Sequence, residues 1–118
     1  MVIDHSRLKI ISASIKYFSN HHVRGYDRKS ERMCRAFAQS ALDKITKKDS
    51  ELSKVELDAV VSALYSYVDM MENNALWFDQ KSLLQANELI DELCNEVHRA
   101  MIPADADEEN TYFSVFYE

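Results

Sequence analysis

Three carboxylates stand close together in the last third of the chain, at Glu88, Asp91 and Glu92. On a helix they share one side, and helical hydrolases hold magnesium with acids placed in this way. Such enzymes need a second acid cluster on a partner helix, but residues 52–72 offer acids only at other spacings. A solvated acidic face is therefore our interpretation, with a metal-dependent hydrolase on these three acids as the second alternative.

A thiol and an imidazole follow on the same stretch. Cys94 and His98 are four residues apart, with Asp91 one turn earlier, a spacing that could bring two metal ligands together or place a nucleophile beside a base. Cys34 would have to supply the third ligand. Cys94 also falls on the apolar stripe of its segment, and buried cysteines usually behave as small apolar residues. We predict no catalytic residue, no metal site and no cofactor.

A basic row offers the best candidate for a ligand site. Arg28, Arg32 and Arg35 recur at i, i+4 and i+7, and Arg24 and Tyr26 lie in the stretch before them. Guanidinium groups near a helix start, with an aromatic ring alongside, suit a phosphate such as that of a nucleotide. Binding of an anionic small molecule here is the first alternative function. Two acids interrupt the row, so direct nucleic-acid binding is not expected.

Residues 104–118 combine acids with aromatic rings. The acids are Asp105, Asp107, Glu108 and Glu109, and the rings are Tyr112, Phe113, Phe116 and Tyr117. An acidic leader before an aromatic end is typical of a peptide that docks into a basic, hydrophobic groove on a partner or on a second copy. The other interpretation is that this segment folds back and covers one end of its own domain.

The clearest helix that could position these groups covers residues 52–71. Ser53 and Glu56 form an S-x-x-E capping box, and Leu52 and Leu57 occupy the two positions of a hydrophobic staple. Apolar residues then recur at helical spacing around more than half of the cylinder. Because its polar stripe is so narrow, this helix has to contact several neighbours, and we expect it to be central.

Three further helices are predicted, over residues 4–20, 27–48 and 80–102. The loop at residues 49–51 is short, which favours antiparallel packing of the second and third helices. The cluster at Leu76, Trp77 and Phe78 is expected to plug one end of the core.

With one Gly and one Pro in 118 residues, the chain has little turn chemistry for hairpins, so we predict an all-α class. The architecture expected is a four-helix, up-down bundle over residues 1–103, with residues 104–118 as an extension packed on the bundle or on a partner. No apolar run reaches the ~20 residues of a membrane span, and the start lacks the features of a signal peptide. Together with free thiols, this predicts a cytoplasmic protein.

The net charge of −6 hides an asymmetry between the two halves of the chain. Residues 1–59 carry 12 Lys and Arg against 8 Asp and Glu, a net +4, whereas residues 60–118 carry 2 against 12, a net −10. The fold can either pair these charges across helices or leave them on separate surfaces that attract oppositely charged partners.

We therefore expect a non-enzymatic protein-protein interaction module that acts as an adaptor or as an inhibitor, for example of a nucleic-acid-handling protein. The partner would be another protein with a basic surface, or a second copy in a homo-oligomer. The acids expected to contact it are Glu88, Asp91, Glu92, Asp105, Asp107, Glu108 and Glu109. Origin in a phage or mobile element would fit an inhibitor of this kind.

Overall fold

The computed structural model describes the whole chain except residues 22–26, 48–50, 77, 103–106, 108 and 118. The described residues form four helices, α1 (His5–Asn20), α2 (Arg28–Thr46), α3 (Lys54–Asn73) and α4 (Gln80–Met101). They also form four short strands, β1 (Val2–Ile3), β2 (Glu51–Ser53), β3 (Tyr112–Ser114) and β4 (Phe116–Tyr117). The predicted helices are confirmed, but the sequence did not indicate the strands.

Each helix begins at a side chain that accepts a hydrogen bond from the backbone of the first turn. Asp4 accepts from the Arg7 amide at 2.9 Å, and Asp27 accepts from the Ser30 amide at 2.7 Å. Asp79 caps α4 in the same way. These caps explain why the helices start where the sequence pattern predicts.

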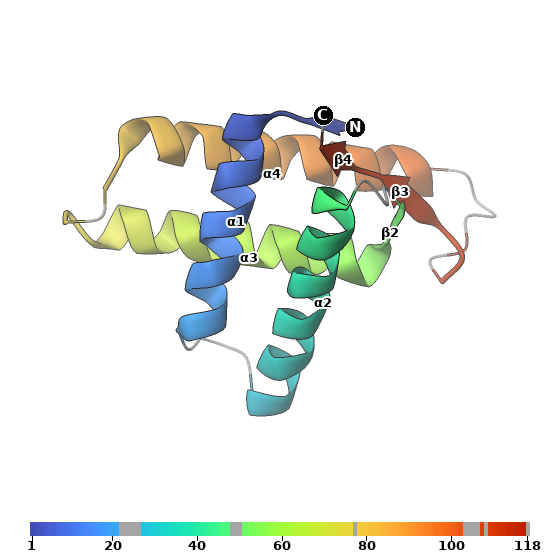
Figure 1. The fold of residues 1–118 in the computed structure, drawn as a ribbon, viewed down its shortest axis with the longest axis horizontal. Helices are drawn as coiled ribbons and strands as arrows, with labels where there is room; N and C mark the ends of the chain where they lie inside the picture. The colour runs from blue at the N-terminus through green and yellow to red at the C-terminus, as the bar shows by residue number, and fades with distance from the viewer. Residues whose placement is uncertain (22–26, 48–50, 77, 103–106, 108, 118) are drawn as a thin grey trace.

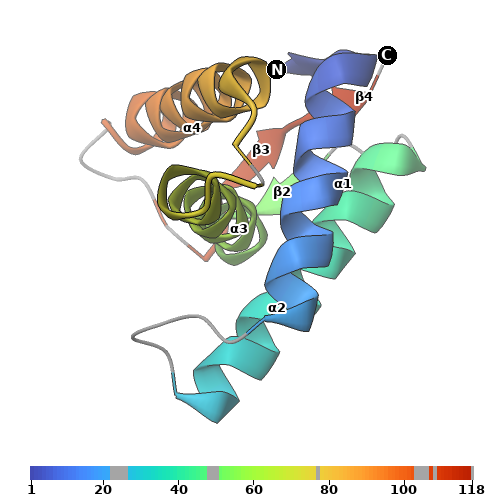
Figure 2. The ribbon, with the colours of Figure 1, turned by 90° about the vertical axis from the view of Figure 1, so that its left-hand side faces the viewer.

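The helices form two layers of two (Figures 1 and 2). The helices α1 and α2 make one antiparallel pair, α3 and α4 make the other, and the two pairs cross. The prediction that α2 and α3 pack antiparallel is therefore wrong, as is the simple up-down bundle. Because α3 is apolar around more than half of its surface, it needs neighbours on two sides. The crossed arrangement gives it α4 on one side and both α1 and α2 on the other.

The core lies where the two layers meet. Its largest fully buried side chains come from all four helices and from β1 and β2: Ile3, Ile11, Ile15, Phe18, Ile45, Leu52, Leu57, Val60, Leu64, Met71, Leu89 and Leu93. Burial of such side chains contributes roughly 1.5–3 kcal/mol each before the cost in conformational entropy. Leu52 and Leu57, the two staple positions, are both buried.

The C-terminal segment lies on the bundle in its described part. The strand β3 pairs antiparallel with β2, with Phe113 opposite Leu52, and β4 pairs parallel with β1. The two ends of the chain thus lie side by side (Figure 1). Phe113 is 5% exposed and Val115 is 1% exposed, so both belong to the core.

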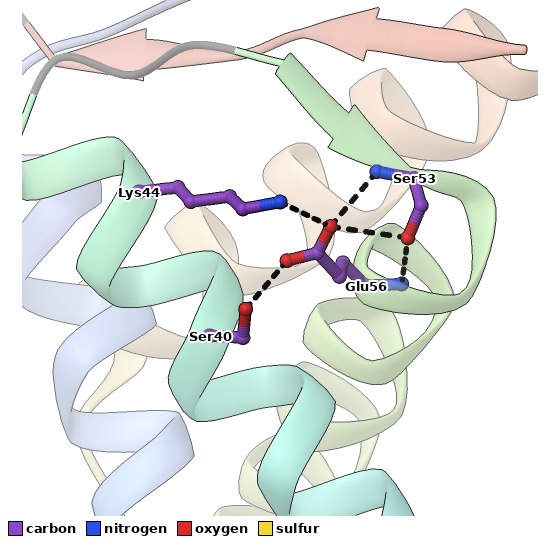
Figure 3. Close-up of polar contacts among 4 residues, drawn as sticks. All are labelled: Ser40, Lys44, Ser53 and Glu56. Atoms are coloured by element: carbon purple, nitrogen blue, oxygen red, sulfur yellow. Dashed lines mark hydrogen bonds and ion pairs between the residues drawn. The ribbon is translucent and has the colours of Figure 1, made fainter.

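A polar cluster fixes the junction of α2 with α3 (Figure 3). The Glu56 carboxylate is only 5% exposed, and it accepts hydrogen bonds from Ser40 Oγ at 2.8 Å, from Lys44 Nζ at 2.9 Å and from the Ser53 amide at 3.0 Å. Ser53 Oγ accepts from the Glu56 amide, which completes the predicted capping box. Burial raises the pKa of Glu56, but the hydrogen bonds from Ser53, Lys44 and Ser40 outweigh it, so the pKa lies below its usual value.

Within the described residues, none of the helices has the length and the apolar composition that crossing a membrane would require.

Candidate functional site

The helix α4 presents an exposed stripe to solvent, which we call the α4 outer face: Leu84, Glu88, Asp91, Asn95, His98 and Ile102. Lys81 and Arg99 are exposed on the same helix, one before the stripe and one beside it. These residues follow one another in steps of four and three, so they lie along one side of the helix. The apolar residues at its two ends, Leu84 and Ile102, are 60% and 66% exposed. The stripe therefore has apolar ends and an acidic middle.

The three acids that the sequence grouped on this helix have different surroundings. Glu92 lies toward α1, where its Oε1 accepts a hydrogen bond from Arg7 Nη2 at 2.6 Å. Glu88 and Asp91 are exposed, and they have no hydrogen bond or ion pair within the part of the chain that the structure describes. Glu92 thus links α4 to α1, while the other two carboxylates remain open to a partner.

Cys94 is exposed beside this stripe, so the prediction that it faces inward is wrong. The inward side of α4 is centred on Leu89 and Leu93, which places the following residue at its edge. Partial burial and the nearby Asp91 and Asp58 raise the pKa of Cys94, so the thiol is protonated at neutral pH and is a poor nucleophile. Among the described residues, no group of three His, Cys, Asp or Glu side chains is placed to hold a metal ion.

Two more exposed apolar residues lie in the turn that leads into α4. Leu76 is 93% exposed and Phe78 is 51% exposed, so the prediction that this cluster plugs the core is wrong for both. Trp77, which stands between them, lies outside the described residues. Met71 near the end of α3 is buried, whereas Leu76 and Phe78 in the following turn lie on the surface.

The C-terminal residues expected to contact a partner are divided between surface and core. Phe113 is in the core, because β3 pairs with β2 and turns this ring inward. Tyr112 on the same strand is 56% exposed, while Phe116 and Tyr117 are partly buried.

The acids that precede these rings are described only in part. Asp107 caps a turn by accepting from the Glu109 amide at 3.0 Å and from Asn110 Nδ2 at 2.6 Å. Glu109 is exposed. Asp105 and Glu108 lie outside the described residues.

The basic row of α2 is also divided. Arg35 donates from Nε to the Phe18 carbonyl at 2.9 Å and from Nη2 to the His21 carbonyl at 2.7 Å, so it caps the C-terminal end of α1. Arg28 and Arg32 are exposed. Arg24 and Tyr26 lie outside the described residues.

A polar cleft of about 610 Å³ lies between the end of α1 and the start of α2. It is lined by Ser19, Asn20, His21, Arg28, Glu31, Arg32 and Arg35. The cleft therefore brings together the three arginines that the sequence singled out. It also contains a carboxylate, because Glu31 is buried and lies 3.6 Å from Arg35 Nη2.

Comparison of the chain with models of protein families, with curated proteins and with solved structures gives no match. The sequence pattern indicated the acids of α4 but not the exposed apolar residues on the same side of the helix. The signal was present in the spacing, since Leu84 lies four residues before Glu88 and Ile102 lies four residues after His98.

Proposed function

We propose that this protein is a protein-protein interaction module, an adaptor or an inhibitor without catalysis of its own, and that its partner binds along the α4 outer face. The observation that carries the proposal is the combination on this face of exposed apolar residues with two carboxylates that have no partner in the described structure. A solvated helix surface usually mixes acids with Lys and Arg. The six residues of the α4 outer face include neither, and the exposed bases of this helix are Lys81 before the face and Arg99 beside it, which pairs with Glu96.

The chemistry of this face selects the partner. The carboxylates of Glu88 and Asp91 lie about one helical turn apart and suit Arg or Lys side chains on a basic surface. Leu84 and Ile102 at the two ends, and Leu76 and Phe78 in the turn before α4, expose apolar area whose burial against a partner would be favourable. A basic surface with apolar pockets is a feature of many proteins that handle nucleic acids, which an acidic helix of this kind could occlude.

A cross-linking experiment in the source cells tests the proposal. A photoreactive amino acid is placed at Asn95, in the middle of the face, and in a second protein at Lys47, an exposed position at the end of α2. We expect a defined cross-linked partner from Asn95 and not from Lys47. The Glu88→Lys/Asp91→Lys variant should lose that partner, because two attractive charges become repulsive.

The matched control is Glu51→Lys/Glu72→Lys, which changes the net charge equally at two exposed acids outside the α4 outer face. This variant should keep the partner. If the two double variants lose it equally, the effect comes from net charge rather than from this face. If the charge-reversed face still yields the same cross-link, the partner binds elsewhere and the proposal is wrong.

A further inference from the structure

Two hollows meet at the last turn of α1, where Asn20 and His21 line both. The first lies between α1 and α3, has a volume of about 540 Å³ and is mainly apolar. The second is the polar cleft with Arg28, Arg32 and Arg35, of about 610 Å³. Both volumes are typical of small-molecule sites. A ligand that spans the two would need one flat apolar part and one anionic part.

Aromatic rings line the apolar hollow. The ring of Tyr17 stacks on the ring of His21, with centroids 4.1 Å apart and planes at 20°. Tyr67 of α3 contributes a third ring, tilted and 6.4 Å from that of Tyr17. Ala13 and Met70 add apolar surface, and Lys16, Asn20 and Asn74 add polar groups to the lining. Such a surface favours a planar aromatic group, which can stack on the rings without needing a specific hydrogen bond.

The end of a helix normally repels anions, because its last carbonyl groups carry partial negative charge. Here side chains donate to several of the carbonyl groups at this end of α1, including those of Tyr17 and Phe18. Asn20 Nδ2 donates to the Lys16 carbonyl at 2.8 Å, and His21 Nδ1 lies 2.9 Å from the Tyr17 carbonyl. Arg35 donates to two further carbonyls, as described above. These bonds reduce the negative potential that an anion in the neighbouring cleft would meet, and the cleft adds three guanidinium groups.

The charge of the polar cleft sets the charge of the anion. Three arginines and the Glu31 carboxylate give it a net charge of +2. A phosphate monoester carries about −1.5 to −2 at neutral pH, which matches this value, whereas a triphosphate would exceed it. Arg28 and Arg32 are the exposed guanidinium groups, and they lie one turn apart on α2.

We propose that this composite site binds a nucleoside monophosphate, with its base against the rings of Tyr17 and Tyr67 and its phosphate at Arg28 and Arg32. Inorganic phosphate would leave the aromatic hollow empty. A single-stranded nucleic acid would need a basic path beyond the cleft, against a chain with a net charge of −6. The site is separate from the α4 outer face, so this proposal does not depend on the proposed function.

Calorimetric titration of the unmodified protein provides the first test. The four common nucleoside monophosphates are compared with their nucleosides, with inorganic phosphate, with ATP and with a single-stranded oligonucleotide. At least one monophosphate should bind on the order of tenfold more tightly than its nucleoside or than phosphate, because only it fills both hollows. Binding of ATP should be weaker than that of AMP.

Two variants separate the halves of the site. In Arg32→Gln, the affinity for the monophosphate should fall to that of the nucleoside, while nucleoside binding is unchanged. In Tyr67→Leu, the affinity for the monophosphate should fall to the affinity for inorganic phosphate. The matched controls are Arg99→Gln and Tyr65→Leu, which alter an exposed arginine and an exposed tyrosine outside both hollows and should leave the affinity unchanged.

The proposal is overturned if no monophosphate binds more tightly than its parts, or if the control variants weaken binding as much as the site variants do. Tighter binding of the oligonucleotide would replace it with a nucleic-acid site. Circular dichroism checks that each variant is folded. If Tyr67→Leu does not fold, the order of affinities in the unmodified protein still decides the question.

Discussion

Carboxylates on two neighbouring helices have opposite surroundings. Glu56 at the start of α3 is buried, and its oxygens accept hydrogen bonds from Ser53, Ser40 and Lys44 (Figure 3). Glu88 on α4 is exposed and has no partner within the described residues. The first side chain fastens α3 to α2, whereas the second contributes nothing to the bundle that the structure shows. A glutamate therefore stabilises the contact between two helices at one place, and at the other it is exposed where a partner can bind it.

The arginines of α2 show the same contrast within a single row. Arg35 closes the end of α1 through two carbonyl groups, while Arg32, less than one turn away, is exposed. In both cases the engaged side chain lies where two helices meet, while the other is exposed and has no bonded partner among the residues that the structure describes. Residues of the second kind are the ones on which proposals about binding should rest.

The largest effect that this comparison predicts is from Glu56→Ala. Removing the carboxylate breaks the capping box and the hydrogen bonds that Glu56 accepts from Lys44 and Ser40, so the free energy of unfolding should fall by about 2–4 kcal/mol. The melting temperature should fall by roughly 10 °C. Thermal and urea unfolding measure both quantities.

Asp58→Ala is the matched control for this variant. Asp58 lies on the same helix, but it is exposed, and its carboxylate forms an ion pair with Lys54 four residues earlier, at 2.8 Å. Loss of this ion pair should lower the free energy of unfolding by less than about 0.5 kcal/mol. Equal costs for the two variants would mean that burial does not distinguish these carboxylates.

A smaller effect is expected from pH, again through Glu56. Its pKa is lower in the folded state than the usual 4.5, because the hydrogen bonds it accepts outweigh the effect of burial. A group of this kind stabilises the fold fully above the usual pKa, and its contribution is lost as the pH falls through the folded-state pKa. The difference in free energy of unfolding between the unmodified protein and Glu56→Gln should thus be constant near neutral pH and should shrink below about pH 4.5.

Comparison with the variant is needed because Asp27 also has a lowered pKa, caused first by its hydrogen bond from the Ser30 backbone. Asp27 contributes equally to the pH dependence of both proteins, so its contribution cancels in the difference of their free energies of unfolding. A difference that stays constant down to about pH 3 would show that the charge of Glu56 is not what the cluster stabilises.

The sequence predicted the helices well, because each start depends on a local signal. Asp4, Asp27, Ser53 and Asp79 act through hydrogen bonds that span two or three residues, and such patterns can be read without the fold. The central place of α3 was also predictable, because it follows from the width of its apolar face.

The crossing of the helix pairs could not be read in this way, because it depends on how whole surfaces fit. The strands were missed for a related reason. They are two or three residues long, and they pair segments far apart in the sequence, Val2 with Phe116 and Leu52 with Phe113. The position of Phe113 in the core follows from that pairing and not from its neighbours in sequence.

The sequence predicted which residue types form the candidate sites. It did not predict which of those side chains are engaged within the fold and which are exposed to a ligand. Spacing placed Arg28, Arg32 and Arg35 on one side of α2, but only the position of α1 shows that Arg35 is engaged. Tyr17 and Tyr67 are fifty residues apart, and their approach depends on the contact of α1 with α3.

The smallest predicted effects concern α4, and they sharpen the comparison among its three acids. Glu92→Gln should lower the free energy of unfolding by about 0.5–1 kcal/mol, because it breaks the bond to Arg7 that joins α4 to α1. Glu88→Gln should change it by less than about 0.3 kcal/mol, since no described residue pairs with it. A double-mutant cycle with Arg7→Gln should find a coupling for Glu92 and none for Glu88. If Glu88 also couples to Arg7 or proves to stabilise the bundle, its carboxylate belongs to the fold, and the α4 outer face loses half of the charge with which it would hold a basic partner.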